Sequence, residues 1–512
     1  MLSEQETMKN VVIIGGGACG SAALIELLIL TITGKLYKKV RFTLIERSAR
    51  VGYGVAFGTE QRSHLLNTQA DLMGIYAYEP GHFAEWLRNR GGKERSDVKG
   101  GSDEESAYTS RILYGHYVAG ELEKNIGKAR KHGISVDLIH AEATEIDRLE
   151  NEQLTVMLDN GSSVTADEIL LAPGTPKPNS FKEFGALREY IDFPWPVHRL
   201  RERIEKKDHV GILGTSLSGI DTVMTLVDNG HRGKITMFSP DGMLPRVQPD
   251  EAGNIEKHHL TLQNLHRLKR QKDHSPTVKE LFRLFIKDVE AAEGKKPDWK
   301  AMKRRARPPL PFLEDDIRLA EKGGDTVLNM TYALRYDTSV IWGWMDPGEQ
   351  QMFRKWLGSY WKANRHAMPL YNARKIAALL REGTLEVVAE NEKVEFDRGS
   401  RQFRIHTASG RTHNADKLVN ATGSAGKLEE MDNILLENLL KKKYLQPHPL
   451  GGAVIDPHTM QCISEKGGTH IYGVGHLVNG MLMDVNAVWF NVRTIARMAT
   501  GIISKITRNG RS

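Results

Sequence analysis

Two stretches of the chain share one pattern of hydrophobic and polar positions. In each, a short apolar run leads into a turn of small residues, then a helix-forming apolar stretch, then a second apolar run. The first stretch, 10–46, contains "GGGACG", and the second, 210–238, contains "GTSLSG". Strand, tight turn, helix and strand form the βαβ unit that binds nucleotides. The pattern predicts an α/β fold with two Rossmann-like dinucleotide-binding domains.

Further alternating segments follow each unit and end in a small-residue turn, "LAPG" at 171–174 and "NATG" at 420–423. Alternation of this kind predicts small antiparallel strands. The stretch 251–370 differs, because it is richer in charge, Trp and Pro. Its segment 278–291 places five apolar residues on one helical face, namely Val278, Leu281, Phe282, Phe285 and Val289. We expect this helix to pack onto the neighbouring domain. We interpret the whole segment as a largely helical insertion that carries substrate specificity.

The first glycine turn has the spacing of a dinucleotide-binding loop. Gly15 permits the tight turn, Gly17 lets the backbone approach a pyrophosphate, and Gly20 lets the helix pack on the strand. Glu46 ends the second strand, where its carboxylate can accept hydrogen bonds from ribose hydroxyls. Arg47 follows directly and is a further candidate for cofactor binding.

The second turn keeps this spacing with Gly214, Ser216 and Gly219. Serine is small enough for a pyrophosphate to approach, so the middle position still fits a nucleotide. The second strand is followed by "SPDG", with no acid at the strand end and no arginine directly after it. Arg246 is the nearest cation. The choice between NADH and NADPH therefore stays open at this point.

Two dinucleotide sites in one chain indicate a flavoprotein. FAD would stay bound as the redox centre, and NADH or NADPH would deliver hydride to it. The chain has only two cysteines, Cys19 and Cys462, in no CxxC pair, which excludes disulfide-shuttling chemistry. The electrons must then pass to oxygen, to an organic substrate or to another protein.

Composition points to a cytoplasmic protein. Few cysteines indicate a reducing compartment, the polar start lacks the features of a secretory signal, and no apolar run has the length of a membrane span. The excess of Lys and Arg lies in residues 255–310. We interpret it as a solvated surface rather than a nucleic-acid site, because no nucleic-acid motif accompanies it, and attraction of an anionic cofactor or substrate is a further alternative. We expect no metal site, since the pair at 258–259 has no companion ligands.

Six stretches together resemble a known family. They are "GYGVAFGT" (52–59), "HLLNTQADLM" (64–73), "HFAEWL" (82–87), "RILYGHY" (111–117), "YWKANRHAMP" (360–369) and "GHLVNGMLMD" (475–484). The resemblance is to FAD/NAD(P)-binding flavoproteins that include urate-hydroxylase-like proteins and the aspartate N-hydroxylases that form nitrosuccinate. More distantly, the layout is similar to ornithine and lysine N-hydroxylases.

The resemblance implies roles for particular residues. It places Asn67 near the flavin ring and His64 near the substrate space, although a purely structural histidine is the alternative. It makes Gly475–Asp484 the last contact with FAD. Arg365, within "NRHAMP", is a candidate to clamp a substrate carboxylate with two parallel N–H donors, and a structural ion pair is its alternative.

These observations define the expected activity and its rival. We expect a monooxygenase that uses NAD(P)H and oxygen to hydroxylate a small polar substrate through a C4a-hydroperoxyflavin. An amino nitrogen of the substrate is one candidate for the atom that is hydroxylated. The rival is a flavin dehydrogenase or reductase that passes electrons to a quinone or a protein partner. The sequence leaves the oligomeric state open.

The expected domains follow from this assignment. Residues 1–205 form the first part of the FAD-binding domain, and residues 206–250 with 371–415 form the NAD(P)-binding domain. Residues 251–370 are the helical insertion, and residues 416–512 return to the FAD-binding domain.

Overall fold

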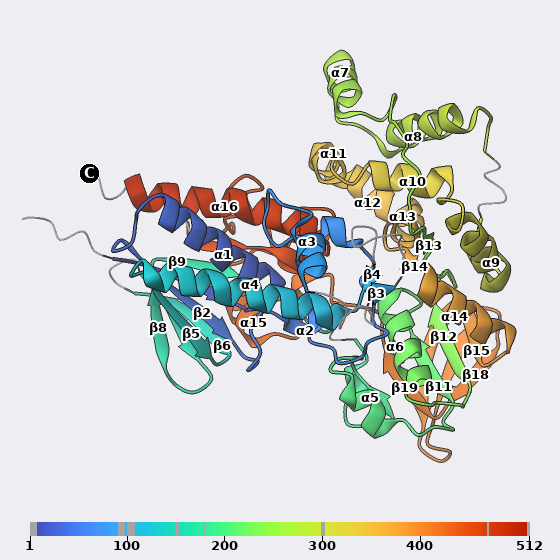
Figure 1. The fold of residues 1–512 in the computed structure, drawn as a ribbon. Coiled ribbons are helices and arrows are strands. Elements are labelled where there is room, and N and C mark those ends of the chain that lie inside the picture. Colours follow the sequence, from blue (N-terminus) through green and yellow to red (C-terminus); the bar gives the residue numbers. More distant parts are fainter. Residues whose placement is uncertain are drawn as a thin grey trace, which may run out of the picture.

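The protein is described by a computed structural model that covers seven ranges of the chain: 8–90, 98–99, 108–149, 153–178, 180–297, 303–467 and 470–508. Two lobes lie side by side, and a group of helices stands on the second lobe (Figure 1). Part of the basic stretch, residues 298–302, falls outside the described residues.

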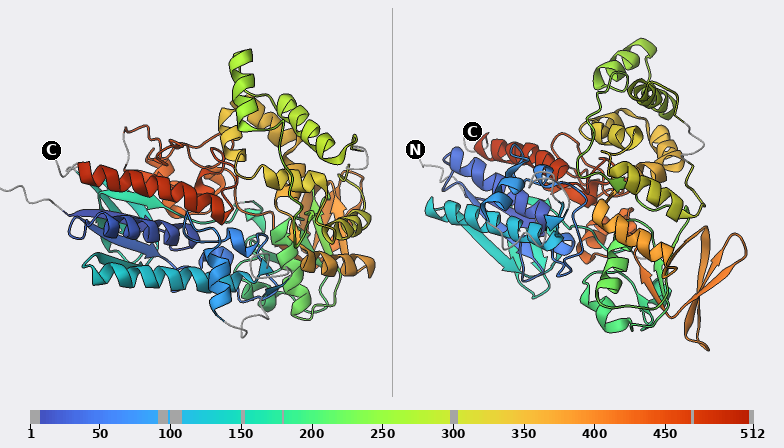
Figure 2. Two further views of the ribbon diagram at one scale, coloured as in Figure 1. Left: turned by 45° about the horizontal axis from the view of Figure 1, so that its top comes forward. Right: turned by 45° about the vertical axis from the view of Figure 1, so that its right-hand side comes forward.

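A five-stranded parallel sheet forms the centre of the first lobe. Its strands, in spatial order, are β20 (Ile471–Gly473), β9 (Glu168–Leu171), β1 (Lys9–Ile14), β2 (Val40–Glu46) and β5 (Ser135–His140). Three long helices run along this lobe, namely α1 (Ala18–Thr33), α4 (Arg111–Lys131) and α16 (Val488–Arg508) (Figures 1 and 2). Because α1 contacts both α4 and α16, its apolar residues are buried almost all round, as expected of an internal helix.

The second lobe repeats this architecture. Its parallel strands are β10 (Tyr190–Ile191), β19 (Lys417–Asn420), β11 (Val210–Leu213), β12 (Ile235–Ser239) and β15 (Leu385–Ala389), again in spatial order. In both sheets the strand before the glycine turn is central, with the next strand of its βαβ unit on one side. The helices of this lobe include α6 (Leu217–Asp228) and α14 (Leu370–Arg381), and α9 (Pro309–Ala320) of the insertion packs on α14. The predicted α/β fold with two Rossmann-like units is therefore confirmed.

Each lobe also carries a small antiparallel sheet, as the alternating segments predict. The first is β6 (Ala143–Arg148), β7 (Leu154–Leu158) and β8 (Ser163–Ala166), and the second is β16 (Asn391–Asp397), β17 (Gln402–Thr407) and β18 (Thr412–Ala415). Each small sheet directly precedes a parallel strand of its own lobe. The remaining elements are α2 (Gly54–Phe57), η1 (Ala70–Leu72), α3 (His82–Asn89), β3 (Val98–Lys99), β4 (Tyr108–Thr109), η3 (Lys182–Phe184), α5 (His198–Arg203), β13 (Val247–Gln248), β14 (Met368–Pro369), η4 (Leu428–Glu430), α15 (Ile434–Lys441) and η5 (Gly475–Val478).

Two of the expected domain boundaries do not coincide with the sheets. β10 lies before residue 205 and β19 lies after residue 416, yet both strands pair within the second sheet. The reason is that β19 pairs directly with β11 and completes the second lobe before the chain returns to the first. The local sequence pattern does not predict this pairing, because β19 and β11 are about 200 residues apart in the chain.

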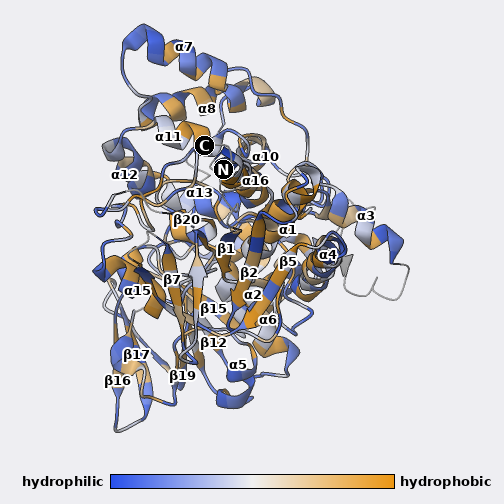
Figure 3. Ribbon diagram, turned by 90° about the vertical axis from the view of Figure 1, so that its left-hand side faces the viewer, coloured by the Kyte–Doolittle hydropathy of each residue, from blue (hydrophilic) through white to orange (hydrophobic). Residues whose placement is uncertain are grey.

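The insertion is helical, as predicted. It contains α7 (Leu262–Lys272), α8 (Val278–Glu293), α10 (Thr326–Ala333), α11 (Thr338–Trp344), α12 (Pro347–Trp356) and α13 (Gly358–Arg365). The predicted helix at 278–291 is α8, which begins with a capping box between Thr277 and Glu280. The expectation that it packs onto a neighbouring domain is wrong, because α8 packs chiefly on α10 and α12 of the insertion itself. Figure 3 shows α7 as a hydrophilic helix far from the hydrophobic strands.

No helix among the described residues is long and apolar enough to cross a membrane. The described part of the chain also holds no group of His, Cys, Asp and Glu side chains arranged to bind a metal ion.

A buried arginine fastens the insertion to the second lobe. Arg246 follows β12 and is 5% exposed. Its Nε donates to Asp316 Oδ1 of α9 at 2.9 Å, its Nη2 pairs with Asp325 before α10, and its Nη1 donates to Asn364 of α13 at 3.1 Å. One guanidinium thus connects three parts of the insertion to the second lobe. The Asp325 carboxylate depends on it for charge compensation, whereas Asp316 is also paired with Arg304.

We predict that Arg246→Met lowers the free energy of unfolding by about 3–5 kcal/mol, because it removes the arginine partner of the Asp325 carboxylate and leaves Asp316 with Arg304 alone. Denaturant unfolding of the purified variant measures this loss. The matched control is Arg374→Met, which breaks an exposed pair with Glu321 at 2.7 Å and is expected to cost less than about 1 kcal/mol. Equal losses in the two variants would contradict the fastening role of Arg246.

Candidate nucleotide and substrate sites

The first glycine turn is built by close contacts between backbone atoms. Gly15 has φ +101°, and a Cβ atom there would lie 2.1 Å from the Ala172 carbonyl oxygen. At Gly20 a Cβ atom would lie 1.8 Å from the Gly15 carbonyl oxygen. Both positions therefore require glycine for the fold itself, since α1 starts directly against the end of β1.

Gly17 has a different role. Its φ of −71° suits any residue, and a Cβ atom there would meet only Gly54, at 3.4 Å. Among the described residues no side chain caps the N-terminus of α1, in contrast to the capped N-terminus of α8. The protein thus leaves room beside uncapped helix N–H groups, which is the arrangement that binds a pyrophosphate.

Glu46 lies at the end of β2 beside this turn. Its carboxylate accepts hydrogen bonds from the backbone N–H groups of Gly16 at 2.7 Å and Ser48 at 2.8 Å. These bonds hold the carboxylate at the sheet edge where a ribose would lie. Arg47 points elsewhere, because its exposed guanidinium lies 3.3 Å from Glu142.

The second turn has the same geometry. Gly214 has φ +114°, and a Cβ atom there would lie 2.4 Å from the Ala421 carbonyl oxygen. A Cβ atom at Gly219 would lie 2.4 Å from the Gly214 carbonyl oxygen. Ser216 takes the place of Gly17 with nearly the same backbone angles, φ −87° and ψ −167°, and it too leaves the helix N-terminus without a side-chain cap. Serine fits there because this backbone conformation is open to any residue.

The C-terminal segment 475–484 connects the first turn to a buried arginine. Gly475 lies against the start of α1, where its Cβ position is 3.3 Å from Cys19 Sγ. At the other end of the segment, Asp484 Oδ1 lies 3.2 Å from Nε of Arg365 at the end of α13. The sequence suggested Arg365 and Asp484 for separate roles, and the structure brings them together as an ion pair.

Arg365 is buried and incompletely paired. Its side chain is 7% exposed and lies between the rings of Tyr332 and Trp489, with centroids 5.6 and 5.5 Å away. Within the described residues, neither its Nη2 nor the Tyr332 hydroxyl has a hydrogen-bond partner. Buried polar groups are normally satisfied, so these two mark a place for a polar ligand. Nothing in the local sequence around Tyr332 or Trp489 indicates this role.

Positive charge dominates this region. Burial and the charge of Arg365 lower the pKa of His366 to about 4, and the same two causes lower the pKa of Arg335. Burial raises the pKa of Tyr332 to about 12, so its phenol stays protonated. The charges that act here are those of Arg365, Arg335 and Lys362 and of the carboxylates of Asp484 and Asp71. The cations outnumber these carboxylates, beside a neutral histidine and a neutral phenol. A bound anion would be stabilised here.

The structure gives His64 three polar partners. Its Nδ1 lies 3.0 Å from Thr59 Oγ1, and its Nε2 lies 2.9 Å from the Asp221 carbonyl oxygen and 2.8 Å from Thr225 Oγ1. Burial lowers its pKa. This geometry favours the structural alternative, in which His64 connects the first lobe to α6. Asn67 is partly exposed and has no hydrogen-bond partner among the described residues, so its predicted place near the flavin stays a prediction.

The two cysteines do not form a redox pair in this structure. Neither forms a disulfide bond within the described residues, and burial raises the pKa of each thiol to about 12. Thiols with such pKa values are poor nucleophiles near neutral pH.

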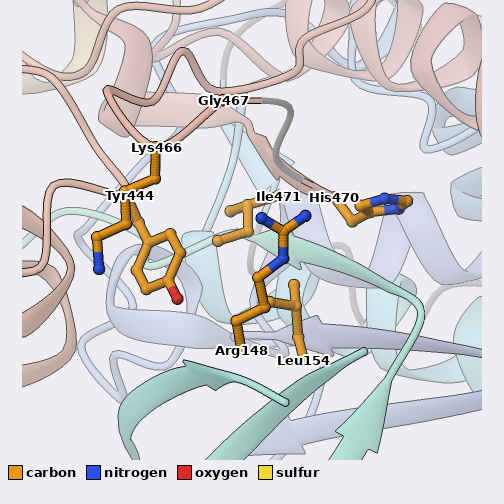
Figure 4. Close-up of a pocket in the computed structure, with 7 residues that line it drawn as sticks. All are labelled: Arg148, Leu154, Tyr444, Lys466, Gly467, His470 and Ile471. Atoms are coloured by element: carbon orange, nitrogen blue, oxygen red, sulfur yellow. The ribbon is translucent and has the colours of Figure 1, made fainter. Parts of the chain in front are cut away.

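A small pocket lies at the amino-terminal end of strand β20 in the first sheet, away from the glycine turn. Arg148, Tyr444, Lys466 and His470 line it together with Ile471 at the start of β20 (Figure 4). Nucleotides bind at the carboxyl ends of parallel strands, whereas this pocket lies where β20 begins. We therefore assign it no part in the nucleotide sites.

The architecture defines the class of protein. Two parallel sheets, each with an uncapped helix behind a glycine turn, form the fold of enzymes that bind two dinucleotides. Residues 12–176, which include β1, α1, β2 and β9 of the first lobe, match the model of the FAD-NAD(P)-binding family.

Comparison with known proteins supports the same fold. The chain is 23% identical over 465 residues to an uncharacterised protein, YdhS, from Escherichia coli K12, and the match covers 81% of this chain and 83% of that protein. It superposes on L-lysine 6-monooxygenase from Pseudomonas syringae with a TM-score of 0.58 and 15% identity, covering 97% and 99% of the two chains. The chain also superposes on the ornithine N-hydroxylase of Kutzneria sp. 744, solved with reduced FAD, NADP+ and L-ornithine. The TM-score is 0.55 and the identity 13%, and the match covers 98% of this chain and 100% of that chain. The chain thus has the fold of N-hydroxylating flavoenzymes.

We predict that Gly17→Ala separates folding from cofactor binding. The added methyl group meets only an ordinary contact, so the melting temperature should change by less than about 2 °C. The same methyl group narrows the approach to the pyrophosphate, as Ser216 does in the second turn without closing it, so FAD affinity should fall by about two- to tenfold rather than be lost. Thermal unfolding of the apoprotein and titration with FAD measure the two effects.

Gly20→Ala is the contrasting variant. Its methyl group collides with a backbone carbonyl, so this variant should lose stability as well as FAD. Full FAD affinity in Gly17→Ala would contradict the assignment of the turn.

Proposed function

We propose that the protein is a flavin-dependent oxidoreductase, specifically a monooxygenase that uses NAD(P)H and oxygen to hydroxylate a small substrate with a carboxylate and an amino group. The first glycine turn with Glu46 would hold FAD, and the second turn would hold NAD(P)H. Bound FAD supplies the redox chemistry, accepting hydride and activating oxygen. The observation that carries the proposal is the segment 475–484, which contacts the first turn at Gly475 and the incompletely paired Arg365 at Asp484.

The residues around Arg365 suit such a substrate. A carboxylate would accept hydrogen bonds from Arg365 Nη2 and the Tyr332 hydroxyl, the two groups without partners in the described chain. An amino group bound nearby would lose protons more readily, for the reasons that lower the pKa of His366. A neutral amine is the form that attacks an electrophilic oxygen. The site thus supplies both orientation and the reactive protonation state.

The rival function, electron transfer to a quinone or a protein, shares the nucleotide sites. Exchange with a disulfide is disfavoured by the buried, high-pKa thiols of Cys19 and Cys462. The unpaired groups at Arg365 favour a small polar substrate over a partner protein, because they lie out of contact with solvent.

The decisive experiment measures NAD(P)H oxidation and oxygen uptake by the FAD-loaded protein with a panel of free amino acids and purines. A monooxygenase should respond to one compound class with faster oxygen uptake, little hydrogen peroxide and a product heavier by one oxygen atom. A reductase should instead reduce a soluble quinone without oxygen and show no response to the panel. Protein that takes up no flavin and leaves reduced nicotinamide untouched would refute both functions.

We predict that Arg365 discriminates carboxylates. In the wild type, a stimulating amino acid should have a KM about tenfold or more below that of its carboxamide, since a buried charged hydrogen bond is worth about 1.5–3 kcal/mol. Arg365→Lys keeps the charge facing Asp484 but removes the planar pair of donors, so it should erase most of this difference.

The KM for reduced nicotinamide should stay unchanged in Arg365→Lys. An unchanged value shows that the variant is correctly folded and that the loss is specific to the carboxylate. The double variant Arg365→Met with Asp484→Asn removes both charges and provides a second folded protein if the single variant is unstable. Unchanged preference for the acid in both variants would refute the role of Arg365.

A further inference from the structure

The two sheets can be aligned residue by residue at their glycine turns. Ile14 pairs with Ile45 at the end of β1, and the Gly15 N–H donates to the Ile45 carbonyl oxygen at 2.8 Å. In the second lobe Leu213 pairs with Phe238, and the Gly214 N–H donates to the Phe238 carbonyl oxygen at 2.7 Å. The residue that follows is Glu46 in the first lobe and Ser239 in the second. Ser239 therefore occupies the position from which the first lobe presents a carboxylate to a ribose.

The loop after Ser239 is firmly held. The Ser239 hydroxyl accepts from the Gly242 N–H at 3.0 Å and lies 3.0 Å from Thr215 Oγ1. Gly242 has φ +61°, and a Cβ atom there would lie 2.7 Å from Ala389 Cβ, which fixes the loop against β15. A neutral hydroxyl thus replaces an acid at this sheet edge. An acid at this position accepts hydrogen bonds from a free 2′-hydroxyl and repels a 2′-phosphate, so its absence removes that repulsion.

The basic stretch of the insertion lies on this same loop. The Ala306 N–H donates to the Asp241 carbonyl oxygen at 2.8 Å, and Arg305 Nε lies 2.5 Å from Asp241 Oδ1. The Asp241 carboxylate also accepts from the Ser359 hydroxyl, so it is committed to partners within the protein. Arg304 lies on the inner side of the stretch, donating to Asp316 at 2.5 and 2.7 Å.

These contacts position one cation at the loop. Arg304 and Ala306 anchor the backbone on either side of Arg305, while the Arg305 side chain remains 49% exposed. The arginine that the local sequence lacks after β12 is therefore supplied from 66 residues further along the chain, as the numbers of Ser239 and Arg305 show.

We propose that Arg305 and Ser239 bind the 2′-phosphate of the second nucleotide, so that the protein uses NADPH in preference to NADH. A guanidinium with parallel donors suits a phosphate group, and the neutral strand end tolerates it. The inference rests on the proposed function, because it requires a nicotinamide nucleotide at the second turn. It assigns a role to basic residues that otherwise form a solvated surface.

The test compares two nucleotide fragments by calorimetric titration of the FAD-loaded protein. 2′,5′-ADP carries the 2′-phosphate, and 5′-AMP lacks it. The wild type should bind 2′,5′-ADP about tenfold or more tightly than 5′-AMP. Arg305→Gln should weaken 2′,5′-ADP binding about tenfold and leave 5′-AMP binding unchanged within about twofold. The control Arg307→Gln changes a nearby exposed arginine and should bind both fragments as the wild type does.

A second variant tests the strand end independently. Ser239→Glu restores the acid of the first lobe and should abolish the preference for 2′,5′-ADP while KM for NADH stays within about twofold. Equal binding of both fragments by the wild type, or an unchanged preference in Arg305→Gln and Ser239→Glu, would overturn the inference and leave the proposed function intact. Failure of the wild type to bind either fragment or either reduced nicotinamide would refute the second nucleotide site, and the inference with it.

Discussion

The structure depends on the close approach of a helix to the strand that precedes it, and this happens twice. In each lobe the backbone after the central strand turns so sharply that a carbonyl oxygen occupies the place of a side chain, at Gly15 in the first lobe and at Gly214 in the second. The helix then starts at the carboxyl edge of the sheet with free N–H groups. This constraint places both nucleotide sites, because nothing larger than glycine lets helix and strand meet this closely.

A second requirement is that the helix of the second turn, α6, is held in place against the first lobe. The pair between Arg111 and Asp221, at 2.8 Å and largely buried, joins α4 of the first lobe to α6 of the second. His64 adds to this connection through Thr225 on the same helix. Since α6 begins at the second turn, these contacts fix the second nucleotide site relative to the first lobe. His64 thus has a structural role in this position, because it holds α6 against the first lobe.

The sequence predicts features that depend on neighbouring residues in the chain and misses those that depend on distant ones. The glycine turns, the strands and the face of α8 follow from local spacing, and all are present in the structure. Periodicity shows which face of α8 is buried but not what buries it, so the predicted partner domain was wrong. The pairing of Arg365 with Asp484 joins residues on different elements, and no local pattern contains it. The register that equates Ser239 with Glu46 likewise becomes visible only when both sheets are aligned.

The insertion gives the duplicated fold its asymmetry. Two similar lobes with similar turns would hold two similar nucleotides, yet a flavoenzyme needs one that stays and one that exchanges. In the first lobe the carboxylate of Glu46 lies beside the glycine turn, and the segment 475–484 contacts the start of α1 at Gly475. The second lobe presents Ser239 and receives its cation from the insertion, where Arg305 stays half exposed. The same insertion carries Arg365 to the end of that C-terminal segment. A single inserted segment thus brings one arginine, Arg305, to the loop after β12 and another, Arg365, to the C-terminal segment 475–484.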